Sequence, residues 1–231
     1  MENFRRPQIV KTKDLKIPNY YTQAIDGEFS EYAFNEERAL AHRDQWRSQV
    51  FKVEESHPID LEIGTGNGIH FQHHCISYPN RGLVGIELKY KPLIQTVRGM
   101  LRKKASNGRV VRFHAFNIDE LFAAGEVNDI FVHFPDPWTT PRKPKNRVMN
   151  PRMLDIFWNL QRSASKLDFK TDSREMFLWA MEQVALSKYK IEFQTLNLHQ
   201  TEMASANVIT GFEKIFVAQG VEINFARLRK S

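Results

Sequence analysis

A carboxylate held between two prolines is the group in this sequence best placed to do chemistry. Asp136 lies between Pro135 and Pro137, and Trp138 follows. The preceding residues, 129–134, are a mostly apolar run bounded by turn residues, which predicts a buried strand. Open α/β sheets build their sites in loops at the carboxyl ends of such strands. The four cations that follow the loop, which favour a large anionic ligand, are Arg142, Lys143, Lys145 and Arg147.

A glycine-rich turn is the second motif, at 62–68, with the sequence Glu-Ile-Gly-Thr-Gly-Asn-Gly. It joins a predicted strand to a predicted helix at 69–78, a context in which a ligand lies against bare backbone and helix amides. The third glycine comes one residue earlier than in the dinucleotide pattern, and Glu62 precedes the first. A carboxylate there repels a pyrophosphate but attracts the ammonium group of a methionine moiety. The turn, with Gly64 and Gly66 against the ligand, therefore favours S-adenosylmethionine.

Two polar residues at the ends of the next predicted strands support this interpretation. Glu87 ends the strand predicted at 82–88, at the distance where an acid meets ribose hydroxyls. Asn117 follows the strand predicted at 110–116, where its amide could read adenine. Each residue alone also fits a structural role, as a surface acid or a turn residue. Taken with the glycine turn, they predict a binding site for S-adenosylmethionine.

The chemistry of methyl transfer limits the role of Asp136. Transfer from a sulfonium is an in-line displacement, so positioning supplies much of the catalysis. An exocyclic amine must lose a proton, whereas N7 of guanine has a free lone pair and needs no general base. Enzymes that methylate amines of adenine or glutamine often carry two adjacent prolines in this loop, and the second is absent here. We therefore expect Asp136 to orient guanine or the cofactor, with capping of its own loop as the structural alternative.

Length and composition suit a cytoplasmic α/β enzyme. The 231 residues are 42% hydrophobic and 26% charged, a globular balance that needs no disulfide or metal to stabilise it. Cys75 is the only cysteine, no apolar run is long enough to span a membrane, and a signal-peptide pattern is absent. The net charge of +6 biases the chain toward polyanions. His70 and His74 have the spacing of a metal-binding pair but lack acidic or cysteine partners, so we expect no metal.

Strands and helices alternate along most of the chain. Residues 1–30 carry prolines and polar groups without a period, and we interpret them as a basic N-terminal arm before a domain at 31–231, which opens with a helix at 31–53. The strands predicted after it are 59–63, 82–88, 110–116, 129–134, 167–171, 189–196 and 221–228. The helices between them are 69–78, 91–106, 151–165, 173–187 and 210–218. We expect a Rossmann-like, doubly wound α/β fold with a mainly parallel seven-stranded sheet whose last strand is antiparallel.

From about residue 31 to its end, the sequence resembles the bacterial tRNA (guanine-N7)-methyltransferases. The motifs that carry the resemblance are 62–68, 85–87, Asn117, 134–138, 169–172 and 210–213. The resemblance implies a methyltransferase that uses S-adenosylmethionine to modify the variable-loop guanosine at position 46 of tRNA. It implies a cofactor site of Glu62, Gly64, Gly66, Glu87, Asn117 and Asp136. It implies a guanine site of Asp172, Thr210, Gly211, Phe212 and Glu213, and an RNA-backbone contact along the stretch from Arg142 to Arg147.

One departure from the family pattern concerns the substrate. Thr140 stands where the family usually has a lysine, so we expect weaker affinity for tRNA or compensation by Arg142. Two alternatives remain open: a methyltransferase for rRNA or protein, and a nonenzymatic RNA-binding protein of the same fold. The intact acidic residues of the motifs argue against the second alternative. The sequence leaves both a monomer and a homodimer open.

Overall fold

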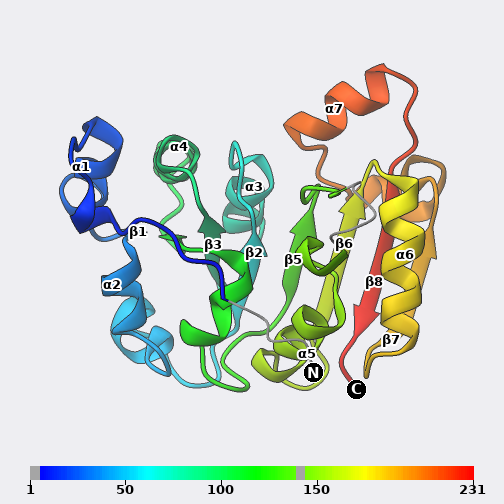
Figure 1. Ribbon diagram of the computed structural model, residues 1–231, viewed down its shortest axis with the longest axis horizontal. Helices are drawn as coiled ribbons and strands as arrows, with labels where there is room; N and C mark the ends of the chain where they lie inside the picture. Colours follow the sequence, from blue (N-terminus) through cyan, green and yellow to red (C-terminus); the bar gives the residue numbers. More distant parts are fainter. Residues whose placement is uncertain (1–5, 139–143) are drawn as a thin grey trace. The chain divides into compact units, whose positions relative to one another are not determined.

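The computed structural model describes residues 6–138 and 144–231, which form two compact units (Figure 1). The first unit contains the chain up to Ile59 together with Thr65–Ala123. The second contains Asp60–Gly64 together with Ala124–Ser231. Thr140, Arg142 and Lys143 lie outside the described residues.

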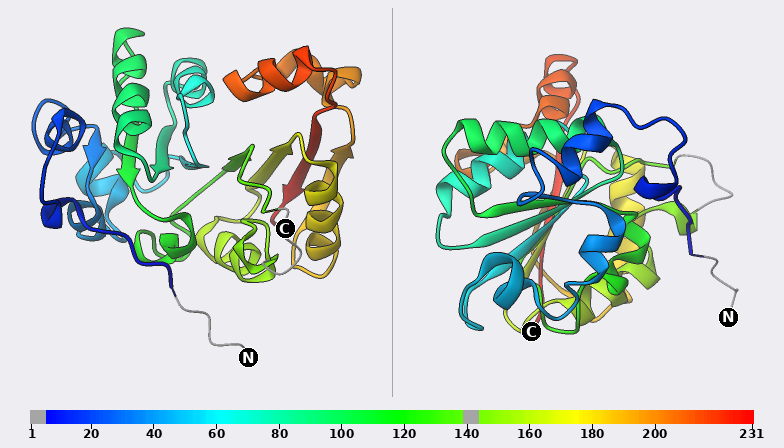
Figure 2. Two further views of the ribbon diagram at one scale, coloured as in Figure 1. Left: turned by 45° about the horizontal axis from the view of Figure 1, so that its top comes forward. Right: turned by 90° about the vertical axis from the view of Figure 1, so that its left-hand side faces the viewer.

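The first unit has a parallel sheet in the order β1–β4–β3, formed by Ala33–Phe34, Gly108–Arg112 and Gly82–Glu87. Helices α3 (Ile69–Ser77) and α4 (Tyr90–Arg102) lie on one face of this sheet, and a π-helix (Trp46–Phe51) lies on the other (Figure 2). The remaining elements are a 3-10 turn at Thr12–Asp14, α1 (Tyr20–Asp26), α2 (Glu36–Leu40) and the 3-10 helix η3 (Ala115–Glu120). The strands are buried, and α4 contributes apolar side chains such as Leu93 and Val97 to the core.

The predicted helix at 31–53 is wrong, because tertiary contacts divide this segment. Its first part pairs with β4 as β1, α2 follows, and Asp44 has a positive φ of 66° before the π-helix begins. Trp46 is fully buried between the rings of Phe34 and Phe122, and its indole donates a hydrogen bond of 2.9 Å to the carbonyl of Leu121. Burial of this indole, with its N–H hydrogen-bonded, stabilises the chain more than continuing a regular helix would.

Gly85, in the middle of β3, provides a stability prediction. A Cβ atom there would lie 2.3 Å from Cγ2 of Thr65 and 2.8 Å from the ring of Phe71, both of them core groups. Gly85→Ala is therefore expected to lower the free energy of unfolding by about 1–3 kcal/mol, measured by urea denaturation. The double variant Gly85→Ala/Thr65→Ser removes the clashing methyl and should recover part of the loss. Equal stability of Gly85→Ala and the parent chain would contradict this packing.

The second unit has five strands in the order β2–β5–β6–β8–β7. The strands β2 (Ile59–Ile63), β5 (Ile130–His133) and β6 (Lys166–Thr171) are parallel, and β8 (Asn224–Arg229) is antiparallel to both β6 and β7 (Lys190–Thr195). Its helices are α5 (Pro151–Leu160), α6 (Arg174–Ala185) and α7 (Gly211–Ala218). Short 3-10 turns lie at Pro144–Asn146, Leu198–Gln200 and Glu202–Ala206.

Side-chain caps explain where the helices of the second unit begin. The Asn150 side chain accepts from the amide of Met153, and Pro151 occupies the first helical position of α5, as the sequence predicts. Ser173 caps α6 in the same way. Thr210 and Glu213 form a reciprocal capping box at α7. These caps fix the first turns of α5, α6 and α7.

The predicted Rossmann-like fold class is confirmed. All seven predicted strands are present, β8 is the antiparallel last strand, and the two-residue β1 is an addition. The strand predicted at 110–116 ends early, at Arg112, because His114 caps a 3-10 helix that contains Asn117. Among the described residues, no helix is long and apolar enough to cross a membrane.

Candidate functional site

The glycine turn and the end of β3 are joined by one carboxylate. Glu87 accepts a hydrogen bond of 3.0 Å from the amide of Gly66 and one of 2.9 Å from the amide of Lys89. Gly66 has a φ of 53°, and no atom lies within 4 Å of the position that a Cβ would take there. The turn thus presents bare backbone to open space beside a half-buried carboxylate, which suits a ligand with hydroxyl donors.

The two other glycines of the turn have different surroundings. Gly68, with a φ of 75°, packs directly on α4, since a Cβ would lie 2.6 Å from the hydroxyl oxygen of Thr96. Gly64, with a φ of 77°, has open space like Gly66. Gly68 therefore serves close packing, whereas Gly64 and Gly66 leave room for a ligand. Glu62, in β2, is 2% exposed.

Asn117 offers an unpaired acceptor in η3 of the first unit. Its Nδ2 donates 2.9 Å to the carbonyl of Pro7, and its Oδ1 is buried without a hydrogen-bond partner. A buried acceptor left unpaired costs about 1–3 kcal/mol. An exocyclic amine such as N6 of adenine is the donor that this oxygen lacks. The residue therefore offers a ligand one unpaired acceptor atom.

The loop that carries Asp136 begins and ends in unusual backbone conformations. Phe134 and Trp138 have positive φ values of 49° and 42°. The amide of Phe134 donates 2.7 Å to the carbonyl of Lys170 in β6, and its ring stacks on Phe216 of α7. Asp136 and Trp138 are exposed, so the loop presents a carboxylate and an indole to solvent from a fixed base.

The described cations of the basic stretch after this loop differ in their exposure to solvent. Lys145 is exposed. Arg147 is 5% exposed: it pairs with Glu175 at 2.8 Å, donates 3.4 Å to the carbonyl of Trp138 and lies over the ring of Trp179. These contacts make the Arg147 guanidinium an anchor for the Asp136 loop in this structure. Its contact with RNA stays a prediction.

The residues predicted to hold guanine follow β6 and begin α7. Burial raises the pKa of Asp172, which comes directly after β6. Thr210 is buried as the cap of α7, whereas Phe212 is 56% exposed and Gly211 is half-buried. Glu213 is fully buried.

The Glu213 carboxylate is the centre of a buried polar network. It accepts 2.7 Å from the ammonium of Lys170 and 2.5 Å from Asn207, and His199 Nε2 lies 2.9 Å away. Lys170 also donates to Oδ1 of Asn207 and to the carbonyl of Val208. Burial lowers the pKa of Lys170, and the negative charge of Glu213 acts against this shift. The network ties the end of β6 to the start of α7.

Within the second unit, the structure thus brings together the Asp136 loop, the end of β6 and the start of α7. Within the first unit, it joins Glu87 to the glycine turn. Lys170, His199 and Asn207 are not among the predicted site residues. A lysine inside the strand predicted at 167–171 was the available signal for Lys170. In residues 6–138 and 144–231, no group of three or more His, Cys, Asp or Glu side chains is arranged to hold a metal.

Comparisons with known proteins found similar sequences over most of the chain. The family model "Putative methyltransferase" matches residues 56–226. The tRNA (guanine-N(7)-)-methyltransferase of Bdellovibrio bacteriovorus is 50% identical over 207 residues, which cover 90% of this chain and 99% of the relative. The enzyme of the same name from Listeria monocytogenes serotype 4b is 33% identical, over 78% of this chain and 83% of its own.

Solved structures show the same fold at low sequence identity. The 16S rRNA methyltransferase KamB has a TM-score of 0.59 at 15% identity, over 86% of this chain and 95% of its own. TrmN from Thermus thermophilus has a TM-score of 0.56 at 15% identity, over 76% of this chain and 44% of its own.

Proposed function

Because this chain belongs to the tRNA (guanine-N7-)-methyltransferase family, we propose that it methylates N7 of the guanosine at position 46 in the variable loop of tRNA, with S-adenosylmethionine as donor. The observation that carries the proposal is the Asp136 loop. An exposed carboxylate follows β5 on a base fixed by Lys170 and Phe216, beside the start of α7. N7 needs no general base, so a rigid orienting carboxylate is the group that this reaction requires.

Each residue of the proposed cofactor site matches the chemistry of one part of S-adenosylmethionine. When bound, S-adenosylmethionine supplies a methyl group on a sulfonium, which makes it electrophilic. Glu62 would attract the ammonium group, and the backbone at Gly64 and Gly66 would lie against the ligand. Glu87 would accept from the ribose hydroxyls, and the free Oδ1 of Asn117 from the adenine amine.

We propose that guanine is held between Asp172 and the start of α7. Asp172 is half-buried, and Phe212 exposes a ring on which a base could stack. A carboxylate at 213 could accept from N1 and the N2 amine of guanine. Because Glu213 already accepts from Lys170 and Asn207, direct contact with guanine would require one of these bonds to rearrange. In the structure as it stands, Glu213 holds the Thr210 turn in place.

We propose that the basic stretch from Arg142 to Arg147 binds the tRNA backbone. Phosphate contacts of this kind release counterions, so tRNA affinity should fall as salt is added. The enzyme would act in the cytoplasm, where its substrate is found.

Thr140 provides a prediction for substrate affinity. Thr140→Lys restores the cation usual in the family and should lower the KM for tRNA several-fold, because each added phosphate contact strengthens binding and steepens its salt dependence. The measurement is KM at two salt concentrations, with Thr140→Gln as an uncharged control of similar length. An unchanged KM in the lysine variant would show that this position makes no contact with RNA.

Methyl transfer with a labelled donor tests the proposed reaction. The protein is incubated with methyl-labelled S-adenosylmethionine and tRNA that lacks the modification, and the product is treated with borohydride and aniline, which cleave at N7-methylguanosine. Incorporated label with cleavage in the variable loop is the expected result. Label without cleavage would indicate a different acceptor atom. No label would contradict methyl transfer to tRNA.

A further inference from the structure

The segment that leads from the N-terminus to α1 is tied to η3 of the first unit. We call residues 6–14 the N-terminal strap (Figure 2, dark blue). Arg6 pairs with Asp119 at 2.7 Å and with Glu120 at 2.5 Å. The next residue, Pro7, accepts the 2.9 Å hydrogen bond from the amide of Asn117. The strap therefore contacts the helical turn that carries the proposed adenine-binding side chain.

The strap continues to the ends of two parallel strands. The carbonyl of Val10 accepts 2.9 Å from Arg112, the last residue of β4. The hydroxyl of Thr12 lies 3.2 Å from that of Tyr90, three residues after Glu87 at the end of β3. The strap thus touches both loops assigned to the adenosine half of the cofactor.

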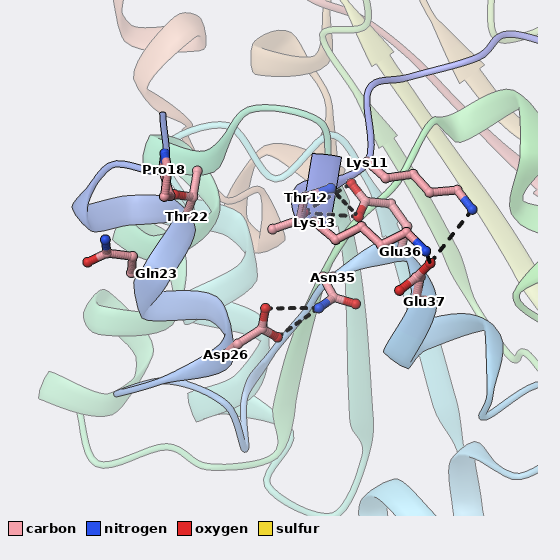
Figure 3. A pocket seen from close by; sticks show the side chains of 10 residues that line it. All are labelled: Lys11, Thr12, Lys13, Pro18, Thr22, Gln23, Asp26, Asn35, Glu36 and Glu37. Atoms are coloured by element: carbon pink, nitrogen blue, oxygen red, sulfur yellow. Dashed lines mark hydrogen bonds and ion pairs between the residues drawn. The ribbon is translucent and has the colours of Figure 1, made fainter. Parts of the chain in front are cut away.

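Polar contacts, rather than an apolar core, hold the strap in place. Thr12 donates from its amide to Glu36 at 3.1 Å, and Lys13 pairs with Glu37 at 2.5 Å. A cavity of about 220 Å³ lies between the strap, α1 and α2, lined by Thr12, Thr22 and Asp26 among others (Figure 3). An exposed ion pair such as Lys13–Glu37 contributes about 0–1 kcal/mol. The bonds of the strap to the buried side chains of Glu36 and Arg112 contribute more, about 1–3 kcal/mol each. Opening the strap breaks these few polar contacts without exposing an apolar core, so its closure can respond to a ligand.

The strap determines which end of the Asn117 amide is available. With Nδ2 committed to the carbonyl of Pro7, the acceptor Oδ1 is the free end. If the strap opens, the amide can turn and present either end. A ligand that donates a hydrogen bond to Oδ1 stabilises the amide orientation found with the strap closed. In turn, the closed strap holds Oδ1 ready for that ligand and so strengthens its binding.

We propose that the N-terminal strap is part of the cofactor site and closes over the adenosine end of the bound ligand through Asn117 and Tyr90. This inference rests on the proposed function, since it takes the ligand to be S-adenosylmethionine. Coupling of this kind is reciprocal. An intact strap raises affinity for the cofactor, and a bound cofactor holds the strap closed.

Affinity for S-adenosylhomocysteine tests the first half of this coupling. This probe carries no net charge at neutral pH, so a change in surface charge alone should alter its binding little. Arg6→Glu is expected to raise its Kd, measured by calorimetry, by about 5-fold or more. The triple variant Arg6→Glu/Asp119→Arg/Glu120→Arg should restore affinity by reversing the ion pairs. Lys16→Glu makes the same charge change outside the strap and should leave the Kd unchanged.

Limited proteolysis tests the second half. Trypsin should cleave after Lys11 and Lys13 several-fold more slowly when S-adenosylhomocysteine is present. If the probe binds the parent chain but Arg6→Glu binds equally well, or cleavage is unaffected, the strap proposal is wrong and the cofactor assignment stands. If the parent chain does not bind the probe, both fail. A melting temperature for Arg6→Glu equal to that of the parent chain checks that the variant is folded.

Discussion

Replacing Asp136 with alanine is expected to lower kcat for tRNA methylation by about 100-fold or more, with saturating tRNA and S-adenosylmethionine. The reason is loss of orientation, since a misplacement of about 1 Å at a reacting centre can cost about 100-fold in rate. Asp136 is exposed on a loop whose ends are fixed by other residues, so the substitution should leave the melting temperature unchanged. Steady-state kinetics give kcat, and thermal melts check that the variant is folded.

The isosteric variant separates an orienting carboxylate from a base. Asp136→Asn keeps one hydrogen-bond acceptor, so it should retain more activity than Asp136→Ala, and its deficit should be the same at every pH. A missing general base is replaced by hydroxide, and the activity of Asp136→Asn would then rise about tenfold per pH unit. Such a rise would contradict N7 as the acceptor and would favour an amine.

Lys170→Met is expected to cause the largest loss of stability. It leaves the fully buried Glu213 carboxylate without its cation, and breaking one partner of a buried ion pair typically costs about 3–5 kcal/mol. The free energy of unfolding, measured by urea denaturation, should fall by this amount. The loop that carries Asp136 should also lose order, because the Lys170 ammonium lies 5.5 Å from the centre of the Phe134 ring and this contact is lost.

A double variant separates the stability of this network from its role in the reaction. Lys170→Met/Glu213→Gln removes both charges, and glutamine can still form the capping box with Thr210. It should recover at least half of the stability lost in Lys170→Met. If the stable double variant also regains methylation, the charge of Glu213 does not read guanine. Strictly additive losses in the two single variants and the double variant would contradict the ion pair itself.

The fold was predictable because periodicity and turn residues agree along most of the chain. The strand at 59–63 and the proline at the start of α5 are found where the sequence places them. The structure of segment 31–53 was not predictable, because it depends on the hydrogen bond from the Trp46 indole to the carbonyl of Leu121, 75 residues away. A periodic pattern carries no information about a partner so distant in sequence.

The candidate site was predictable where a motif fixes the backbone and not where it depends on pairing between elements. The glycine turn and the Asp136 loop can be recognised in the sequence because glycine and proline restrict the backbone at fixed positions. The partners of Glu213 come from β6 and from two segments after β7, and no local pattern relates them. The strap was predicted only as a basic arm, because the bond between Pro7 and Asn117 spans 110 residues.

A tRNA that lacks the proposed nucleophile tests the account most directly. In 7-deazaguanosine a carbon replaces N7, while the Watson–Crick edge of the base is unchanged. We expect tRNA with this base at position 46 to bind like unmodified tRNA, to accept no methyl group and to inhibit methylation of normal tRNA competitively. Methyl incorporation into the 7-deazaguanosine tRNA at the rate of the guanosine tRNA would contradict the account, because the methyl group would then go to another atom.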